Sequence, residues 1–157
     1  MPTAVVPVVF YRDPMAALAW LEKAFGFELA MLVTDQEGRL GHAEMSWRGA
    51  AIGVGGEWAS PEILGPAALK SPASLGGVGT QFVRLFMEEG LDEHCERARA
   101  AGARITYEPA DQFYGDRAYR ALDLEGHVWN FAQKVKELSV AQMEAASGLT
   151  FARGGER

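Results

Sequence analysis

Apolar positions along the first third of the chain form short runs whose spacing changes from strand-like to helical and back. Residues 5–10 are apolar throughout and predict a buried strand. Asp13-Pro14 predicts a helix start, because an N-cap acceptor followed by proline suits the first turn, and Gly26 predicts its end. Three further strands are expected over 27–34, 40–47 and 50–55.

The same order begins again after an irregular stretch. Residues 57–79 contain Pro61, Pro66 and Pro72 with several glycines and little periodicity, which predicts a linker or long surface loop. The elements expected beyond it are a strand at 81–87, a helix at 91–101, a strand at 103–107, a polar loop at 108–117 and paired strands at 118–122 and 127–132.

The two halves keep a nearly constant offset. The glycines that close the helices, Gly26 and Gly102, lie 76 residues apart, and the last-hairpin glycines, Gly49 and Gly126, lie 77 apart. Equal order at a constant offset indicates an internal repeat. The predicted fold class is α+β, with two tandem βαβββ modules whose curved mixed sheets surround a cleft.

The expected organisation is one two-module domain followed by a short tail. We expect this domain over residues 1–133, with module one at 4–56, the linker at 57–79 and module two at 80–133. Residues 134–157 are expected to form a C-terminal helix and tail, since Ser139 and Gln142 have the spacing of a capping box.

Composition narrows the possible partners. The chain has 157 residues and a formal net charge of −6, whereas binding nucleic acid requires clustered cations, so no nucleic-acid partner is expected. No apolar run approaches the roughly 18 residues of a membrane span and no signal-peptide pattern opens the chain, so we expect no membrane partner and a cytoplasmic location. Cys95 is the single cysteine, and we interpret it as a small buried hydrophobe.

Two segments of module two suggest a family. The turn Asp123-Leu124-Glu125-Gly126-His127 leads into Val128-Trp129-Asn130-Phe131, and the loop Tyr114-Gly115-Asp116-Arg117 precedes it. Together with the repeat, these segments resemble the vicinal-oxygen-chelate superfamily over about residues 4–133. That superfamily includes glyoxalase I, the bleomycin-resistance proteins and the extradiol dioxygenases. The resemblance implies a homodimer.

The superfamily's metalloenzymes hold a divalent cation with side chains from the first and last strands of each module. In this sequence the resemblance places those positions at Val6, Gly53, near Phe82 and at Asn130. Only Asn130 offers an oxygen, so we expect no metal and no cofactor.

His42 and Glu44 raise a separate metal question. They lie two apart on one predicted strand and therefore share a face. Two alternatives are open: they form half of a different metal site, or they line a polar sheet face.

Ligand-binding candidates lie at the expected edges of the cleft. Tyr114, Asp116 and Arg117 form either a rim that contacts a ligand or a loop braced by an Asp–Arg pair. Trp58, on the linker, is a candidate for stacking on an aromatic ligand. Because Trp129 and Asn130 alternate along a strand, only one faces the cleft, and the metal-ligand register assigns Asn130 to it.

Two functions follow from these residues. The first is metal-independent binding of a small molecule in the cleft between modules, with cationic and aromatic molecules as candidate ligands, as in the antibiotic-sequestering relatives. The alternative is an enzyme of the lyase, isomerase or dioxygenase class with a relocated or absent metal site, in which His42, Glu44, Tyr114 and Asp116 are the suspected groups. A regulatory or structural module is a third interpretation.

Overall fold

The first half of the chain forms a βαβββ module, as expected. The computed structural model describes residues 4–152 and residue 154. In order, the first module contains β1 (Val8–Tyr11), α1 (Pro14–Phe25), β2 (Glu28–Thr34), β3 (Leu40–Trp47) and β4 (Ala50–Gly56). The sheet order is β1-β4-β3-β2, with β1 parallel to β4 and the other neighbours antiparallel.

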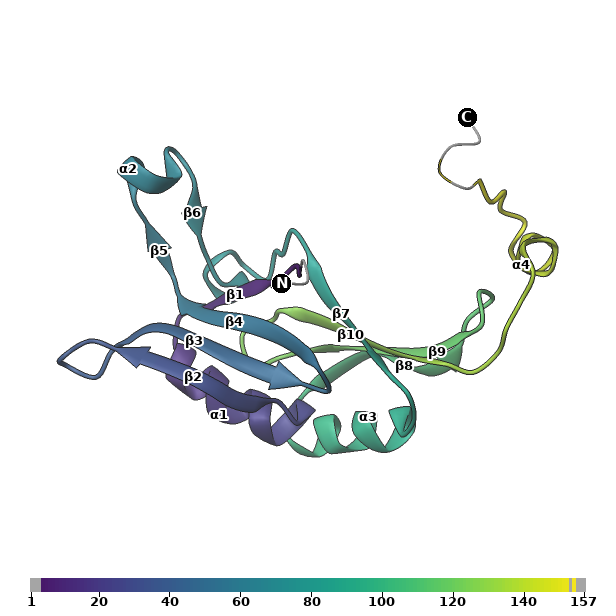
Figure 1. The fold of residues 1–157 in the computed structure, drawn as a ribbon, viewed down its shortest axis with the longest axis horizontal. Helices are drawn as coiled ribbons and strands as arrows, with labels where there is room; N and C mark the ends of the chain where they lie inside the picture. The colour runs from purple at the N-terminus through teal and green to yellow at the C-terminus, as the bar shows by residue number, and fades with distance from the viewer. Residues whose placement is uncertain (1–3, 153, 155–157) are drawn as a thin grey trace.

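The second half repeats this architecture. It contains β7 (Phe82–Met87), α3 (Leu91–Ala100), β8 (Arg104–Asp111), β9 (Asp116–Leu122) and β10 (Val128–Lys134), in the sheet order β7-β10-β9-β8. Each sheet thus mixes one parallel pair with antiparallel pairs, and both helices lie below the sheets in Figure 1. The predicted α+β class and the duplicated module are confirmed.

The signals that predicted α1 act as expected. The Asp13 carboxylate accepts a hydrogen bond from the backbone N–H of Ala16 at 3.0 Å, and Pro14 occupies the first turn. Gly26 ends the helix with a φ of 75°, a conformation that costs most other residues energy. The strand expected from residue 5 begins only at Val8, and Val5 is 94% exposed.

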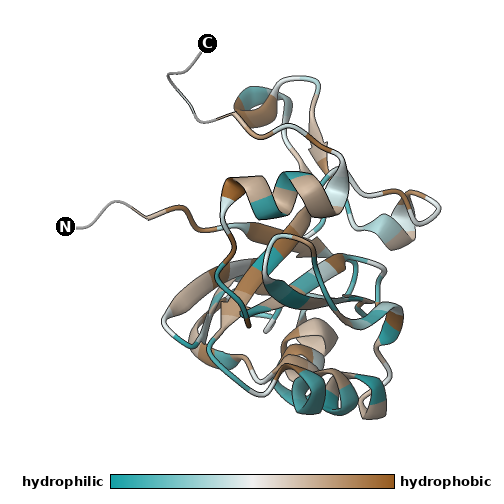
Figure 2. Cartoon of the chain, turned by 90° about the vertical axis from the view of Figure 1, so that its right-hand side faces the viewer, coloured by the Kyte–Doolittle hydropathy of each residue, from teal (hydrophilic) through white to brown (hydrophobic). Residues whose placement is uncertain are grey.

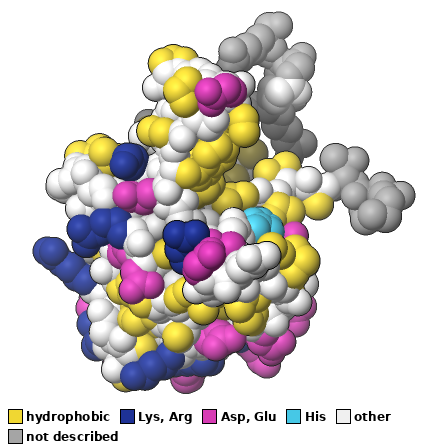
Figure 3. All heavy atoms as spheres, turned by 90° about the vertical axis from the view of Figure 1, so that its left-hand side faces the viewer, with side chains coloured by type: hydrophobic (Ala, Val, Ile, Leu, Met, Phe, Trp, Pro, Cys, Tyr) yellow, Lys and Arg dark blue, Asp and Glu magenta, His cyan; other side chains and the backbone are white. Residues whose placement is uncertain are grey.

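The linker contains more structure than its composition predicts. Strands β5 (Trp58–Ala59) and β6 (Ala68–Leu69) pair antiparallel around α2 (Pro61–Leu64), and a 3₁₀ turn follows at Pro72–Ser74. The segment joins the two modules as a linker, but its short hairpin was not predicted, because two-residue strands are too short to produce a periodic pattern. This arm projects from the body in Figure 1, and Figure 3 shows hydrophobic side chains gathered along it.

Two other elements bear on the predicted boundaries. The polar loop expected at 108–117 is shorter, because β8 continues to Asp111 and β9 begins at Asp116. Irregular register between β8 and β9 disturbs the alternation in this region. The predicted C-terminal helix is present as α4 (Val140–Ser147) with its capping box, and the tail positions 153 and 155–157 lie outside the described residues. Within the described chain no helix is long and apolar enough to cross a membrane.

One hydrophobic cluster connects the modules through their helix-covered sides. Phe25, at the end of α1, packs against Trp129 and Phe131 of β10, with ring centroids 5.4 and 4.8 Å away. The Trp20 indole donates a hydrogen bond to the Ala101 carbonyl at 3.0 Å, which joins α1 to the end of α3. The helices in the lower part of Figure 2 alternate hydrophobic and hydrophilic positions, as amphipathic helices do.

A buried carboxylate fixes β1 against the last hairpin of module two. Asp123, only 7% exposed, accepts hydrogen bonds from the Tyr11 hydroxyl at 2.7 Å and the Trp129 indole at 3.0 Å. Its other oxygen accepts from the backbone N–H groups of Glu125 and His127. One side chain therefore holds both a turn and a contact between the modules.

The neighbouring Glu125 connects the linker to the start of α1. Its carboxylate accepts hydrogen bonds from the backbone N–H groups of Arg12 and Asp13 and from the Ser71 hydroxyl. Burial raises the pKa of Glu125, but these hydrogen bonds outweigh it and hold the pKa below its usual value. The linker is therefore attached to the body beside β1.

The polar residues of α3 do not all face solvent. His94 lies among acidic residues in the sequence but is only 7% exposed: Nε2 donates to the Phe25 carbonyl at 2.9 Å, and Nδ1 accepts from the Tyr119 hydroxyl at 2.7 Å. Cys95 is fully buried, as expected, and burial raises its pKa to about 11.

The state of His94 predicts a pH dependence of stability. Burial lowers the His94 pKa, so the unfolded chain binds the proton more tightly than the folded chain. The stabilisation is therefore complete above the unfolded pKa of about 6.5 and is lost as the pH falls below it, at up to about 1.4 kcal/mol per pH unit.

Urea unfolding between pH 8 and pH 5 measures this loss. A His94→Asn variant is expected to be less stable at pH 8 but to lack the decline that begins near pH 6.5 in the unmodified chain. Equal pH slopes for the two proteins would contradict the assignment.

Candidate functional site

Each sheet has one face against its helix and one open face. On β3, Ala43, Met45 and Trp47 are buried on the helix side, so His42 and Glu44 lie on the opposite face. The same alternation holds in module two, where Trp129 and Phe131 are buried beside the helices. Helices α1 and α3 pack against the sheets on the faces that carry these buried residues. The two open faces are therefore the surfaces where the candidate residues gather.

On the open face of module one, two glycines lie beneath large side chains. A Cβ atom at Gly53 would lie 3.0 Å from Val8 and 3.3 Å from His42, and one at Gly55 would lie 3.0 Å from the Phe10 ring. Neighbouring side chains thus occupy the space that a larger residue at position 53 would need.

Apart from His42, the exposed side chains on this face are acidic or apolar. His42 Nε2 lies 3.6 Å from Glu44 Oε1, and both side chains are about half exposed. Glu28 pairs in register with Ser46 and belongs to the same face, as do the exposed side chains of Met31 and Val33.

The open face of module two centres on Asn130. In register, Asn130 lies between Arg84 of β7 and Arg120 of β9. Arg84 donates to Asp116 Oδ2 at 2.9 Å, and its guanidinium lies 4.9 Å from the Phe86 ring centroid and 5.7 Å from that of Tyr114. Arg120 lies 5.6 Å from the Tyr107 ring centroid.

Asn130 is the least satisfied polar group of this face. It is 3% exposed, and its Nδ2 donates a long hydrogen bond of 3.4 Å to the Tyr119 carbonyl. Its Oδ1 has no partner among the described residues. A buried acceptor without a donor costs about 1 to 3 kcal/mol, which suits a position where a ligand supplies the donor.

The predicted rim residues separate onto two faces. Asp116 is buried and pairs with Arg84 and Lys134, whereas Arg117 lies on the helix side and pairs with Asp92 at 2.8 Å and Asp111 at 2.9 Å. Of the two alternatives, an Asp–Arg pair does brace the loop, but it joins Arg117 to Asp111, because the consecutive strand residues Asp116 and Arg117 point to opposite faces. Arg117 is also removed from the open face for this reason.

Trp58 lies apart from the other candidates. It is on β5 of the arm, 39% exposed, and opposite Leu69 in register. Its stacking role stays a prediction, since no contact of the described chain joins it to the Asn130 face.

The positions that hold metal in related proteins do not fit a cation here. Val6 and Phe82 are apolar and exposed, Gly53 has no side chain and no room for one, and Asn130 alone has an oxygen. Within residues 4–152 and residue 154, no group of three or more His, Cys, Asp or Glu side chains is placed to hold a metal. Among the residues that the structure describes, no third side chain of these types joins His42 and Glu44.

Two βαβββ modules in tandem, each with one sheet face against a helix and one open face, define the fold class of this chain. The sequence model of the Glyoxalase/Bleomycin resistance protein/Dioxygenase superfamily matches residues 4–131. The chain therefore belongs to this superfamily.

Similar proteins extend the match along the chain. Protein Rv0887c of Mycobacterium tuberculosis is 29% identical over 143 residues, which cover 91% of this chain and 81% of that protein. The crystal structure of TioX from Micromonospora sp. ML1 shares 29% identity with a TM-score of 0.64, covering 85% of this chain and 100% of TioX. FosX from Listeria monocytogenes, solved with Mn(II) and sulfate, has a TM-score of 0.60 at 15% identity and covers 93% of this chain and 98% of FosX. At 15% identity, the similarity to FosX shows only that the two proteins share a fold.

Arg84 and Arg120 were not among the site residues predicted from the sequence. Both are in register with Asn130, so the signal was present in the alternation of β7 and β9 once Asn130 was assigned to the open face. The missing information was the pairing register, which joins Arg84 to Asp116 across 32 residues of sequence.

Proposed function

We propose that this protein binds a small molecule without a metal, using the open face of one module against that of another. The observation that carries the proposal is the Asn130 face, where an unpartnered buried oxygen lies between two arginines that stack on aromatic rings. The residues at the four positions that hold metal in related proteins are poor metal ligands. This favours binding that relies on stacking and hydrogen bonds.

The two open faces suggest what the ligand carries. Arg84 and Arg120 present guanidinium planes, which stack on aromatic groups, and Asn130 Oδ1 requires a hydrogen-bond donor. Glu28 and Glu44 on module one attract cationic groups. The best-matched ligand is therefore aromatic, has an amide or amine N–H, and carries positive charge at a separate position.

The cleft is completed by a second copy in this proposal. Each open face exposes apolar side chains such as Val33 and Phe86 beside its charges, and a second copy would cover them. An acidic face on module one and an arginine-rich face on module two are complementary, so a symmetric dimer satisfies both at once. Sedimentation velocity should show twice the chain mass of 17.0 kDa, and a strictly monomeric chain would contradict this arrangement.

Thermal unfolding in EDTA tests the binding itself. Within a panel of cationic aromatic compounds that includes bleomycin and ethidium, at least one compound is expected to raise the melting temperature of the unmodified protein, because a ligand that binds only the native state stabilises it.

An Asn130→Ala variant should lose most of this shift, since the ligand's donor no longer has an acceptor. The matched control is Trp58→Ala, which tests the arm: an unchanged shift removes Trp58 from the binding site. A panel without any shift, or shifts that require added metal, would contradict the proposal.

A further inference from the structure

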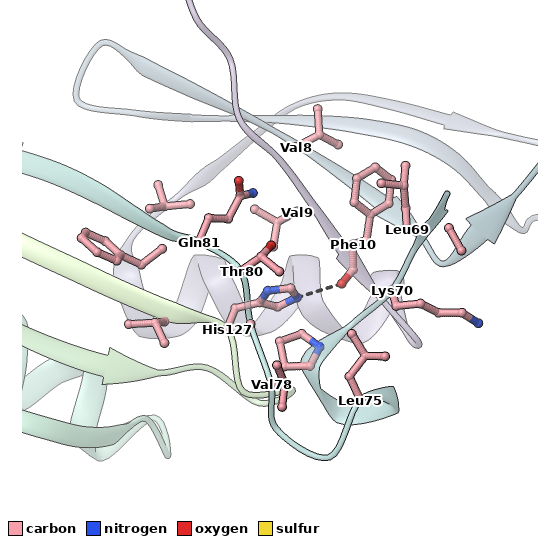
Figure 4. A pocket seen from close by; sticks show the side chains of 16 residues that line it. Val8, Val9, Phe10, Leu69, Lys70, Leu75, Val78, Thr80, Gln81 and His127 are labelled. Carbon is pink, nitrogen blue, oxygen red and sulfur yellow. Dashed lines mark hydrogen bonds between the residues drawn. The ribbon is translucent and has the colours of Figure 1, made fainter. Parts of the chain in front are cut away.

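A pocket of about 560 Å³ lies at the seam between the two modules of one chain. Its walls come from β1, from β7 with the start of β10, and from the linker after β5 (Figure 4). Val8, Phe10 and Phe82 at the edges of the open faces line it, whereas Asn130, Arg84 and Arg120 do not. Its volume falls within the range of about 300 to 1,000 Å³ that is usual for small-molecule sites.

The lining is mainly aliphatic and aromatic. The apolar wall includes Val9, Phe10, Leu69, Leu75, Val78 and Val83. Lys70 is the one charged side chain of the lining apart from the titratable His127, but Figure 4 shows its ammonium directed away from the pocket, and it lies 3.7 Å from Glu57 Oε2. A pocket of this kind favours an uncharged ligand, because burying an unpaired charge is costly.

His127 supplies a defined hydrogen-bonding group in this pocket. Its Nε2 lies 2.8 Å from the Phe10 carbonyl oxygen, which only accepts, so Nε2 carries the proton. In the uncharged ring Nδ1 is then an acceptor, and it has no hydrogen-bond partner within the described chain. An edge-to-face contact with Tyr11, at 4.7 Å between centroids, also fixes the ring.

The polar groups of the pocket are gathered on one side. Figure 4 shows Thr80, Gln81 and His127 together, opposite Leu69 and Lys70. A molecule that fills the pocket therefore meets hydrogen-bonding groups at one end and apolar groups over the rest. Because the tautomer of His127 is fixed, the complementary ligand group at that end is a donor.

We propose that the seam pocket is a second binding site, which takes an uncharged aromatic molecule bearing one hydroxyl group. The ring packs against the aliphatic wall, and the hydroxyl donates to His127 Nδ1. This site lies within one chain, so it does not depend on the dimer or on the cationic ligand proposed for the Asn130 face.

A matched pair of probes tests the donor requirement. In isothermal titration at pH 8, 1-naphthol is expected to bind with one site per chain. Its ether, 1-methoxynaphthalene, has no donor and should bind about tenfold more weakly, the effect of one lost hydrogen bond. Equal affinities, or no saturable binding of 1-naphthol, would overturn the proposal.

Variants then locate the site. Val78 is 62% exposed on the linker, so Val78→Trp is expected to fold and to abolish 1-naphthol binding by filling the pocket. His127→Phe should reduce the affinity for 1-naphthol to that for the ether, whereas the control His42→Phe, on the module-one face, should leave it unchanged.

Nitrogen NMR of the imidazoles gives a readout that does not depend on stability. Addition of 1-naphthol to the unmodified protein should shift the Nδ1 resonance of His127 and leave that of His42 in place. Binding that survives Val78→Trp, or a shift confined to His42, would place the probe elsewhere and overturn the assignment.

Discussion

Replacing Asp123 with alanine is expected to lower the free energy of unfolding by about 3 to 5 kcal/mol, because several donors lose their acceptor at once. The Tyr11 hydroxyl and the Trp129 indole are both buried, so water does not replace the carboxylate. Burial, and next the Asp123 charge, raises the pKa of Tyr11, so the phenol keeps its proton and remains a donor.

Urea unfolding monitored by tryptophan fluorescence measures this effect. Asp123→Asn should cost less than alanine, because its one amide oxygen can still accept from two of the four donors. The matched control is Asp111→Ala, which removes an exposed carboxylate paired with Arg117 and should change the stability by less than about 1 kcal/mol. A similar small cost for Asp123→Ala would show that this carboxylate does not hold the modules together.

Replacing Gly115 with alanine is expected to destabilise the protein by about 2 to 4 kcal/mol and to disorganise the Asn130 face. Gly115 has a φ of 95°, and a Cβ atom there would collide with the carbonyl oxygen of Lys136. The Gly115 carbonyl also accepts backbone hydrogen bonds from Val135 and Lys136, both at 3.0 Å. The loop that carries Tyr114 and Asp116 is therefore held against the segment after β10 at this one residue.

The control for Gly115 is a glycine with equally positive φ in an open environment. Gly102 has the same φ of 95°, and a Cβ atom there would have no described neighbour within 4 Å, so Gly102→Ala reports the backbone strain alone. The excess cost at Gly115, measured by urea unfolding, is the cost of the collision. Equal costs at the two positions would contradict the close approach to Lys136.

The sequence predicts the fold well because its signals are local. Helix-closing glycines, the Asp13-Pro14 start and the alternating strands act within a few residues, and their repetition shows the duplication. The arm was missed because β5 and β6 have only two residues each. The burial of His94 has no local signal, because its neighbours in sequence are acidic whereas its contacts in space are Phe25 and Tyr119.

The candidate site was predictable only in part. His42 and Glu44 share a face as strand alternation requires, and Trp129 and Asn130 divide between two faces as expected. The pairing of Asp116 with Arg84 depends on sheet register, which no local pattern contains. The crowding around Gly53 and the seam pocket likewise arise from side chains that are distant in sequence.

Elemental analysis tests the central claim, metal-independent binding, most directly. The protein would be purified without chelator or affinity tag from cells grown with added zinc, nickel, manganese and iron. The residues at the four expected metal positions, Val6, Gly53, Phe82 and Asn130, predict a content of each metal well below one per chain, together with a ligand-induced shift in melting temperature that EDTA does not change. One tightly bound metal per chain, with ligand binding lost on its removal, would contradict the account.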